Sequence, residues 1–442
     1  MFTARSSVRR YLSTWLAYFR FRLALLPVAE PARRWPRIDA VGSADRHRRS
    51  YLVRTTRIAA TLLTAGVLLA SAACSSSKKA ATSPTSSAAS PTAASSSAST
   101  APTTTAATST APVAAGSAPA CASGTLSAQG STFQANMETQ WSKDFGTKCS
   151  GAKINYQGTG SGAGITAIGN GTADFAGSDV TMTADQQTAA NTACGSTALT
   201  IPVTAGGIAV TYNLSGVTSL KLSAATIAGI FSGKIAKWND PAIAADNSGA
   251  TLPSTPISVF YRNDSSGSTS VFTTFLKADA GSAWTLGASK TITFFSGAQG
   301  AKGSAGVAAG VKQTSGGITY VETSYAKAQS LPTASIKGEG SYVDATSATV
   351  STAIGEGFSV TGTGNDLAGA MDYAKMATGY PISTVSYAIV CSKYKDAAKG
   401  GLVKSYLGYA VTTGQAAADG LGFSPLPSDL AAKALASISA VS

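Results

Sequence analysis

The sequence predicts an α/β protein built from two domains, and two observations support that fold class. From about Gly124 onward, short β-rich runs alternate with segments of helical pattern, which is typical of strand-helix units with parallel pairing. This part of the chain is about 320 residues long, which exceeds one ordinary doubly wound domain and is sufficient for two.

The first 57 residues carry most of the positive charge of the chain. They contain thirteen arginines against three acidic residues, whereas from Cys74 onward 21 Lys and Arg side chains face 18 Asp and Glu side chains. The formal charge of +13 therefore belongs mainly to the N-terminus. Because binding to nucleic acid depends on excess Lys and Arg, we expect no nucleic-acid partner for the rest of the chain.

Residues 48–74 have the organisation of a secretory signal peptide. A basic stretch precedes an apolar run from Ile58 to Ala70, and small residues follow that run. The apolar run is shorter than the roughly 20 residues that a membrane-spanning helix needs, which favours cleavage over the alternative of an uncleaved anchor. We therefore expect residues 1–73 to be a leader and signal peptide, and the remainder to be exported.

Cys74 directly follows the small residues Ser71–Ala73, which resembles a bacterial lipoprotein processing site. At such a site the cysteine is acylated and becomes the first residue, although leucine is usual at the position of Ser71. Residues 75–120 are almost wholly Ser, Ala, Thr and Pro and cannot bury a core. We expect 74–120 to be a lipidated cysteine followed by a disordered tether.

The alternation begins directly after the tether. Three β-rich runs are each followed by a helical pattern, at 124–130 before 132–145, at 153–157 before 163–171, and at 257–261 before 268–278. Two further β-rich runs are 173–178 and 208–214.

Three of the strand-to-helix junctions are rich in Ser, Thr and Gly: "AQGSTF" (128–133), "GTGSGAG" (158–164) and "NDSSGST" (263–269). Hydroxyls and unpaired N–H groups at the start of a helix lie at the positive end of its dipole, where an anion is stabilised. Ser and Thr are also ordinary helix N-caps, so one such junction alone would be structural. Three junctions in one chain favour an anion site.

Arg262 is the only arginine after Arg57, although the same region uses lysine freely. A guanidinium offers a rigid fork of donors that matches two oxygens of a tetrahedral oxyanion, which a lysine ammonium cannot do. Asp264, two residues on, is placed to hold that fork. The alternative is a surface ion pair between Arg262 and Asp264, worth under about 1 kcal/mol.

Asp179 ends the stretch "TADFAGSD". A carboxylate beside an anion site is useful if the ligand carries a proton, because it accepts a hydrogen bond from P–OH and repels a fully deprotonated anion such as sulfate. The alternative is an N-cap for the helix expected around 182–187.

The sequence after the leader lacks the histidine that many hydrolases and metal sites use. The sole histidine, His47, lies in the leader, so the exported chain has no Ser-His-Asp triad and no histidine metal ligand. Residues 158–163 followed by Asp179 mimic a dinucleotide-binding fingerprint, but that interpretation leaves Arg262 without a role. We predict no enzyme activity, no cofactor and no metal.

The cysteines after Cys74 are even in number, which in an exported chain favours two disulfides. Four cysteines allow three pairings, and the residues alone do not choose among them. The four are Cys121, Cys149, Cys194 and Cys391.

A series of longer motifs occurs in order along the chain: "GSTF", "INYQGTGSGAGITAIGNGTADFAGSD", "IPVTAGGIAVTYNL", "IAGIFSGKIAKWNDPAI", "LPSTPISVFYRNDSSGSTSVFTTFL", "GGITYVE" and "YPISTVSYAIV". With these motifs the chain from about Gly124 to its C-terminus resembles the phosphate-binding proteins of bacterial phosphate-specific ABC importers, a branch of the type II periplasmic-binding-protein superfamily.

The resemblance implies a two-lobed type II periplasmic-binding-protein fold, in which two crossing strands near 201–207 and 381–387 join the lobes. Lobe I would comprise 121–203 plus 384–442, and lobe II would comprise 204–383. The same topology implies that Cys121 pairs with Cys149 and Cys194 with Cys391.

The resemblance also implies a phosphate site. Arg262 would make the charged contact and be held by Asp264, while Asp179 would accept the proton of hydrogen phosphate. Hydroxyls and N–H groups would come from Thr132, Phe133, Ser161, Ser266, Gly267 and Ser268. The family usually has Gly at the position of Ser265 and Thr at that of Ser268; a side chain at Ser265 puts the loop geometry in question where φ is positive.

The function that the resemblance implies is extracytoplasmic phosphate capture and delivery to the membrane permease of an ABC importer. The chain would be a monomer held at the cell membrane by its lipid anchor. The alternatives are a receptor for sulfate or molybdate, a surface phosphatase, and a phosphate-responsive adhesion protein. Asp179 argues against the first, and the lack of histidine after the leader argues against a phosphatase.

Overall fold

The structure is a computed structural model, and it describes residues 117–442. The predicted leader 1–73, the lipidation of Cys74 and nearly all of the predicted tether lie outside the described residues. Within 117–442, no helix is both long and apolar enough to cross a membrane.

The helices and strands follow the predicted alternation in the first part of the chain. The strands are β1 (Gly124–Gly130), β2 (Ala152–Gly158), β3 (Phe175–Ser178), β4 (Ala198–Asn213), β5 (Lys221–Leu222), β6 (Ser258–Arg262), β7 (Gln299–Ala301), β8 (Gly317–Glu322), β9 (Ser335–Lys337), β10 (Tyr342–Val343), β11 (Phe358–Val360), β12 (Gly369–Met371) and β13 (Ser383–Cys391). The α-helices are α1 (Ala135–Lys148), α2 (Ser161–Gly169), α3 (Ala184–Cys194), α4 (Ala224–Phe231), α5 (Pro241–Asp246), α6 (Gly267–Asp279), α7 (Gly303–Gln313), α8 (Thr323–Ala328), α9 (Ser347–Gly357), α10 (Ala397–Val411), α11 (Ala418–Leu421) and α12 (Ser428–Ser439).

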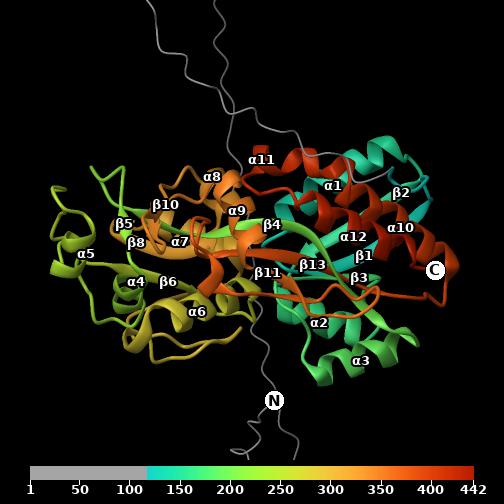
Figure 1. The fold of residues 1–442 in the computed structure, drawn as a ribbon, viewed down its shortest axis with the longest axis horizontal. Helices are drawn as coiled ribbons and strands as arrows, with labels where there is room; N and C mark the ends of the chain where they lie inside the picture. The colour runs from blue at the N-terminus through green and yellow to red at the C-terminus, as the bar shows by residue number, and fades with distance from the viewer. Residues whose placement is uncertain (1–116) are drawn as a thin grey trace, which may run out of the picture. The chain divides into compact units, whose positions relative to one another are not determined.

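One eight-stranded sheet runs through the described part in the order β2-β1-β3-β13-β4-β8-β6-β7. β1 is parallel to both β2 and β3, and β6 is parallel to both β7 and β8, as the strand-helix alternation predicts. β4 and β13 are antiparallel to each other in the middle of the order. The result is a mixed sheet with a parallel portion on each side (Figure 1).

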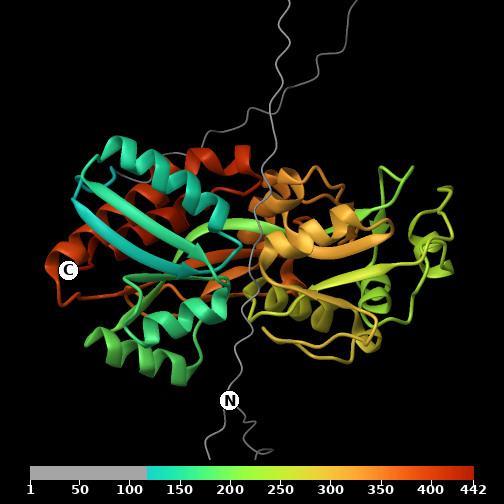
Figure 2. The same cartoon turned by 180° about the vertical axis from the view of Figure 1, so that it is seen from behind.

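The long strand β4 joins two lobes. Residues 198–207 pair with β13, and residues 208–213 pair with β8 instead. Figures 1 and 2 show that this strand runs from the lobe that contains β1–β3 to the lobe that contains β6–β8, with β13 beside it. The predicted two-lobed α/β fold is therefore confirmed, whereas the exact lobe boundaries at residues 203 and 384 stay a prediction.

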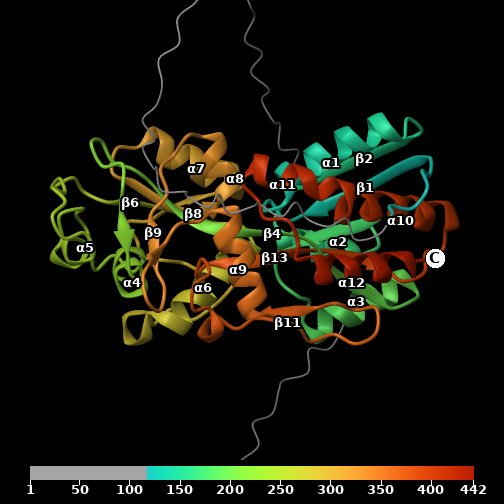
Figure 3. The same cartoon turned by 45° about the horizontal axis from the view of Figure 1, so that its top comes forward.

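Helices cover both faces of the sheet in the first lobe. Ile165 and Ile168 of α2 and Ala190 of α3 pack on one face in a small apolar cluster with Ile389 of β13. α1, α10 and α12 lie on the opposite face and belong to the main core (Figure 3). The inner strands β3, β4 and β13 are buried almost throughout, as expected for strands with helices on both faces, whereas the outer strands β1 and β2 alternate exposed residues with buried or half-buried ones.

The second lobe is layered in the same way. Val307 and Val311 of α7 pack on Phe260 of β6 and Val321 of β8. On the other face, Phe272 of α6 stacks on a tyrosine of β8 with ring centroids 4.3 Å apart. This packing fixes the start of α6 beside the end of β6, which is the junction around Arg262.

Two disulfides close the first lobe. Cys121 pairs with Cys149, and Cys194 pairs with Cys391. This is the pairing that the family resemblance implied. The second bond joins the end of α3 to the end of β13, which are 197 residues apart in sequence.

A buried carboxyl group lies in the core of the first lobe. Glu138 of α1 is fully buried, and its Oε2 accepts a 2.5 Å hydrogen bond from the hydroxyl of Tyr406 in α10. Burial raises the pKa of Glu138 to about 8. The folded protein therefore holds a proton on Glu138 at neutral pH that the unfolded chain has released.

We expect Glu138→Gln to flatten the dependence of stability on pH. The pKa of Glu138 is raised on folding, so its contribution to the free energy of unfolding is largest below pH 4.5 and is lost as pH rises to about 8. Over that window the free energy of unfolding should fall by about 4 kcal/mol more in the unsubstituted protein than in the variant. Denaturant unfolding at several pH values measures this, and parallel profiles would show that Glu138 does not hold the proton.

Candidate functional site

Arg262 is buried at the end of β6, with only 2% of its surface exposed. Its Nε and Nη2 donate to the two carboxylate oxygens of Asp264 at 2.7 and 2.5 Å. Burial opposes the charge of Arg262, but Asp264 more than offsets this, so the pKa of Arg262 lies above its ordinary value. The ion pair is thus a buried, bidentate one, and the alternative of a loose surface pair does not describe it.

The remaining guanidinium nitrogen of Arg262 points to hydroxyls from two other segments. Nη1 donates to Thr132 Oγ1 at 3.0 Å and to Ser304 Oγ at 3.1 Å. These two hydroxyls are 2.7 Å apart. Thr132 precedes α1 in the first lobe, so Arg262 of the second lobe reaches across to it.

Asp264 has its own support. Gly303, the first residue of α7, donates its N–H to Asp264 Oδ1 at 3.1 Å. Burial alone would raise the pKa of Asp264, but Arg262 and the N–H of Gly303 lower it below its ordinary value. Asp264 therefore remains charged and holds the guanidinium in one orientation.

Asp179 lies just after β3 and is 3% exposed. Its Oδ1 accepts hydrogen bonds from the hydroxyls of Ser131 and Ser386, the latter at 2.6 Å, and its Oδ2 accepts one from Ser161 at 3.1 Å. The N-cap of α3 is Thr183, not Asp179. A carboxylate held by hydroxyls alone, with no cation bonded to it in the described part, does not have the role of a helix cap.

Burial raises the pKa of Asp179 to about 6. The hydroxyls of Ser131, Ser386 and Ser161 oppose this shift, and the negative charge of Glu322 adds to it. Asp179 is therefore ionised at neutral pH and becomes a neutral acid when the pH falls below about 6.

The two lobes meet at these residues. Gly162 at the start of α2 donates its N–H to the carbonyl oxygen of Ser265 at 3.0 Å. Gly267 at the start of α6 lies directly against Asp179, because a Cβ on Gly267 would fall 2.5 Å from Asp179 Oδ2. Gly160 has a φ of +96°, which favours glycine. Glycines therefore allow the starts of α2 and α6 to approach each other.

Ser266, Gly267 and Ser268 at the start of α6 were expected to offer donors to a ligand, but Ser266 already has partners within the protein. The side chain of Ser266 accepts from the N–H of Thr269 as the N-cap of α6, and the N–H of Ser266 is already bonded to the carbonyl of Lys290. The N–H groups of Gly267 and Ser268 belong to the first turn, where no intrahelical acceptor exists. The hydroxyl of Ser268 donates to Glu322.

The structure brings the predicted site residues into two adjoining clusters at the lobe contact. One contains Thr132, Arg262 and Asp264, and the other contains Ser161 and Asp179 with Gly267 against them. The ring of Phe133 is buried against Phe423, and no hydrogen bond in the described part uses the N–H groups of Thr132 and Phe133. The question of whether the position of Ser265 needs a glycine is also answered. Among residues 117–442, Ser330 is the single non-glycine residue with a positive φ. Ser265 therefore has a negative φ, and its backbone does not require glycine.

Four polar residues that contact these clusters were not predicted: Ser131, Ser304, Glu322 and Ser386. Ser131 is adjacent to Thr132 in the first junction and shares its pattern. Glu322 is an acid that ends the apolar run "GITYVE", which is a signal that sequence inspection can use. Ser304 and Ser386 have no comparable local signal.

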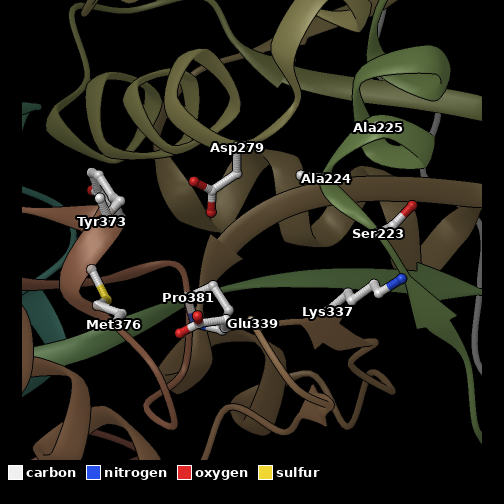
Figure 4. A pocket seen from close by; sticks show the side chains of 11 residues that line it. Ser223, Ala224, Ala225, Asp279, Lys337, Glu339, Tyr373, Met376 and Pro381 are labelled. Carbon is white, nitrogen blue, oxygen red and sulfur yellow. The ribbon is translucent and has the colours of Figure 1, made fainter.

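A separate pocket lies on the second lobe, and none of the predicted site residues lines it (Figure 4). Its charged residues are Asp279, Lys337 and Glu339, and Tyr373 and Pro381 also line it. Within 117–442, no group of three or more His, Cys, Asp or Glu side chains could hold a metal ion.

A two-lobed α/β fold whose lobes meet at a buried guanidinium and helix N-termini is that of a type II periplasmic binding protein. Residues 115–413 match the family model described as a PBP superfamily domain. The chain therefore belongs to the PBP superfamily and, within it, to the family of the PstS proteins, as the following relatives show.

The phosphate-binding protein PstS 3 of Mycobacterium leprae is 42% identical over 312 residues, which cover 69% of this chain and 83% of that protein. The phosphate-binding protein PstS 2 of Mycobacterium tuberculosis is 39% identical over 328 residues, covering 72% and 87%. The family predicted from the sequence motifs is thus confirmed.

Solved structures share the fold. The high-affinity periplasmic phosphate-binding protein PfluDING, solved with bound phosphate, aligns with a TM-score of 0.58 at 24% identity over 71% of this chain and 93% of that one. A phosphate-binding protein from Stenotrophomonas maltophilia aligns with a TM-score of 0.57 at 22% identity, over 71% and 93%.

Proposed function

We propose that the chain binds inorganic phosphate outside the cytoplasm and delivers it to an ABC-type phosphate importer. Its relatives at about 40% identity are named phosphate-binding proteins. The observation that carries the proposal is the pair of buried groups at the lobe contact: Arg262, held by Asp264, and Asp179, held by three serine hydroxyls. Arg262 favours binding of an anion, and Asp179 favours an anion that carries a proton.

The proposed binding site uses both clusters. Arg262 would supply the charged contact, and first-turn N–H groups of α2 and α6 would supply directed donors from both lobes. Thr132, Phe133, Ser161, Ser266, Gly267 and Ser268 would provide the remaining hydroxyl and N–H groups. Binding by closure of the lobes removes water from the anion, and a near-complete set of directed donors offsets the loss.

No bond is made or broken in this proposal, so the chain would not be an enzyme. We further propose that it acts as a monomer and that acylated Cys74 anchors it to the cell membrane, with residues 75–120 as a flexible tether. The support for the anchor is the signal-peptide pattern that precedes Cys74.

Calorimetric titration with phosphate and then with sulfate tests the proposal. We expect the chain from Cys74 onward to bind phosphate at least about a hundredfold more tightly than sulfate near neutral pH, because ionised Asp179 repels an anion that has no proton to donate. Equal affinity for the two anions, or no binding of phosphate, would overturn it. Release of phosphate from a chromogenic ester would instead favour the surface-phosphatase alternative.

A further inference from the structure

Helix α8 directly follows β8 in the second lobe, and its side chains also bond to the first lobe. The hydroxyl of Tyr325 donates to the carbonyl oxygen of Thr132 at 3.1 Å. The side-chain amide of Asn136 in α1 donates to Ser324 Oγ at 3.1 Å. Ser324 is 3% exposed, so this second bond is largely shielded from water.

A lysine of α8 adds a bond to the end of α11. Lys327 Nζ donates to the carbonyl oxygen of Gly420 at 2.8 Å. The last carbonyls of a helix have no partner within it, and a cation near them is favourable. α8 and α11 lie side by side in Figures 1 and 3. The bonds that Ser324, Tyr325 and Lys327 make to the first lobe are called the α8 contact below.

The two sides of the α8 contact belong to different lobes. Ala326 of α8 belongs to the apolar cluster of the second lobe, with Val311 of α7 and Val321 of β8. α11 packs on α1 and follows Gln415, whose side chain donates to the carbonyl of Val203 in the first-lobe part of β4. A rotation that opens the lobes therefore moves α8 away from α1 and α11.

Another bond between the lobes lies next to β4 and is not part of the α8 contact. The hydroxyl of Thr323 donates to the carbonyl of Gly422. Two residues further on, Ser424 exchanges backbone hydrogen bonds with Ala205 of β4. β4 changes its partner from β13 to β8 just after residue 207, so the lobes move least relative to each other there. We expect the bond of Thr323 to persist when the lobes open.

The α8 contact depends on hydrogen bonds more than on apolar packing. A pocket of about 360 Å³ lies beside it and is lined from both lobes, by Asn136 of α1, Lys327 of α8 and Leu421 of α11 among others. A second pocket, of about 330 Å³, is lined by Thr323 and Asp419. With open space beside the helix, the contact can separate without exposing an apolar core.

The α8 contact uses no donor that the proposed anion site needs. Tyr325 bonds to the carbonyl of Thr132, whereas the hydroxyl of Thr132 is bonded to Arg262. Bonds that exist only while the lobes are closed stabilise the closed form, and they also stabilise any ligand held within it.

We propose that the α8 contact slows the release of phosphate, because it holds the lobes together through bonds that the anion does not make. The inference rests on the proposed function. It assigns Asn136, Tyr325 and Lys327 as positioning residues, since they act on the anion only through lobe closure. Release requires the lobes to part, so loss of these bonds should raise the dissociation rate. Capture by the open form precedes the contact, so the association rate should not change.

The experiment uses a triple variant of the chain from Cys74 onward: Tyr325→Phe, Asn136→Ala and Lys327→Met. These changes remove the three donors and keep the aromatic ring and the lysine stem. Radiolabelled phosphate should leave the variant about tenfold faster after excess unlabelled phosphate is added, and phosphate affinity should weaken by the same factor. The association rate should stay within about twofold. Tyr325→Phe alone should raise the release rate about threefold.

The matched control is Tyr394→Phe. Its hydroxyl also donates to a carbonyl, that of Asp174 at 2.7 Å, but both residues lie in the first lobe. The control should lower thermal stability and leave the release rate unchanged.

Two results would overturn the inference. One is an unchanged release rate in a folded triple variant, which would leave the α8 contact without influence on closure. The other is a slower association with unchanged release, which would mean that these residues act at the entrance to the site. If the triple variant does not fold, the release rate of Tyr325→Phe decides. Failure of the unsubstituted chain to bind phosphate would instead refute the proposed function.

Discussion

Replacing Arg262 with lysine is expected to weaken phosphate binding about a hundredfold, or ~2.7 kcal/mol. Arg262 uses two nitrogens for Asp264 and a third for the hydroxyls of Thr132 and Ser304. A lysine ammonium is a single point and cannot span these partners, so either Asp264 loses its cation or the contact toward Thr132 is lost. Because Asp264 is only 12% exposed, a carboxylate without its partner is costly there.

Titration calorimetry of Arg262→Lys with phosphate measures the loss, and thermal unfolding checks that the variant is folded. Lys375→Ala is the control, because it removes an exposed ion pair with Asp372 and should leave phosphate affinity unchanged. A folded Arg262→Lys protein with unchanged affinity would reduce Arg262 to a structural ion pair that plays no part in binding.

The α/β fold could be predicted where each element has enough residues to show its pattern. β1, α1, β2 and α6 are long enough to show their own pattern, and each agrees with a predicted segment. β5 and β10 have two residues each, so no periodicity exists to detect them. The change of partner along β4 is a tertiary event, and only the family resemblance placed a crossing there.

A site residue could be predicted from the sequence only where its residue type is rare in the surrounding chain. Arg262 was detectable because the chain has no other arginine after Arg57. Ser386 could not be detected in this way, because serine is common throughout the chain and Ser386 reaches Asp179 only through the pairing of β13 with β3. Ser304 likewise meets Arg262 from a helix more than forty residues later. Such contacts depend on the packing of the lobes and not on local sequence.

Replacing Asp179 with asparagine is expected to abolish the rejection of sulfate, reducing the ratio of phosphate to sulfate affinity about a hundredfold near pH 7.5. Ionised Asp179 can only accept hydrogen bonds, and three hydroxyls already donate to it. An asparagine has no charge and can turn its NH₂ toward an unprotonated oxygen. The same change should weaken phosphate, because the acceptor for P–OH loses its charge.

The pH dependence of sulfate binding separates this role from a structural one. Burial places the pKa of Asp179 at about 6, so in the unsubstituted protein sulfate affinity should rise as the pH falls through 6 and the neutral acid gains a proton to donate. Asp179→Asn should bind sulfate with little pH dependence over the same range. Asp279→Asn is the matched control, since burial also raises the pKa of Asp279, but Asp279 lies in the separate pocket (Figure 4) and should not alter selectivity. If Asp179→Asn still rejects sulfate at every pH, the discrimination between the two anions must come from the donors around Arg262, because Asp179 would then have no part in detecting the proton.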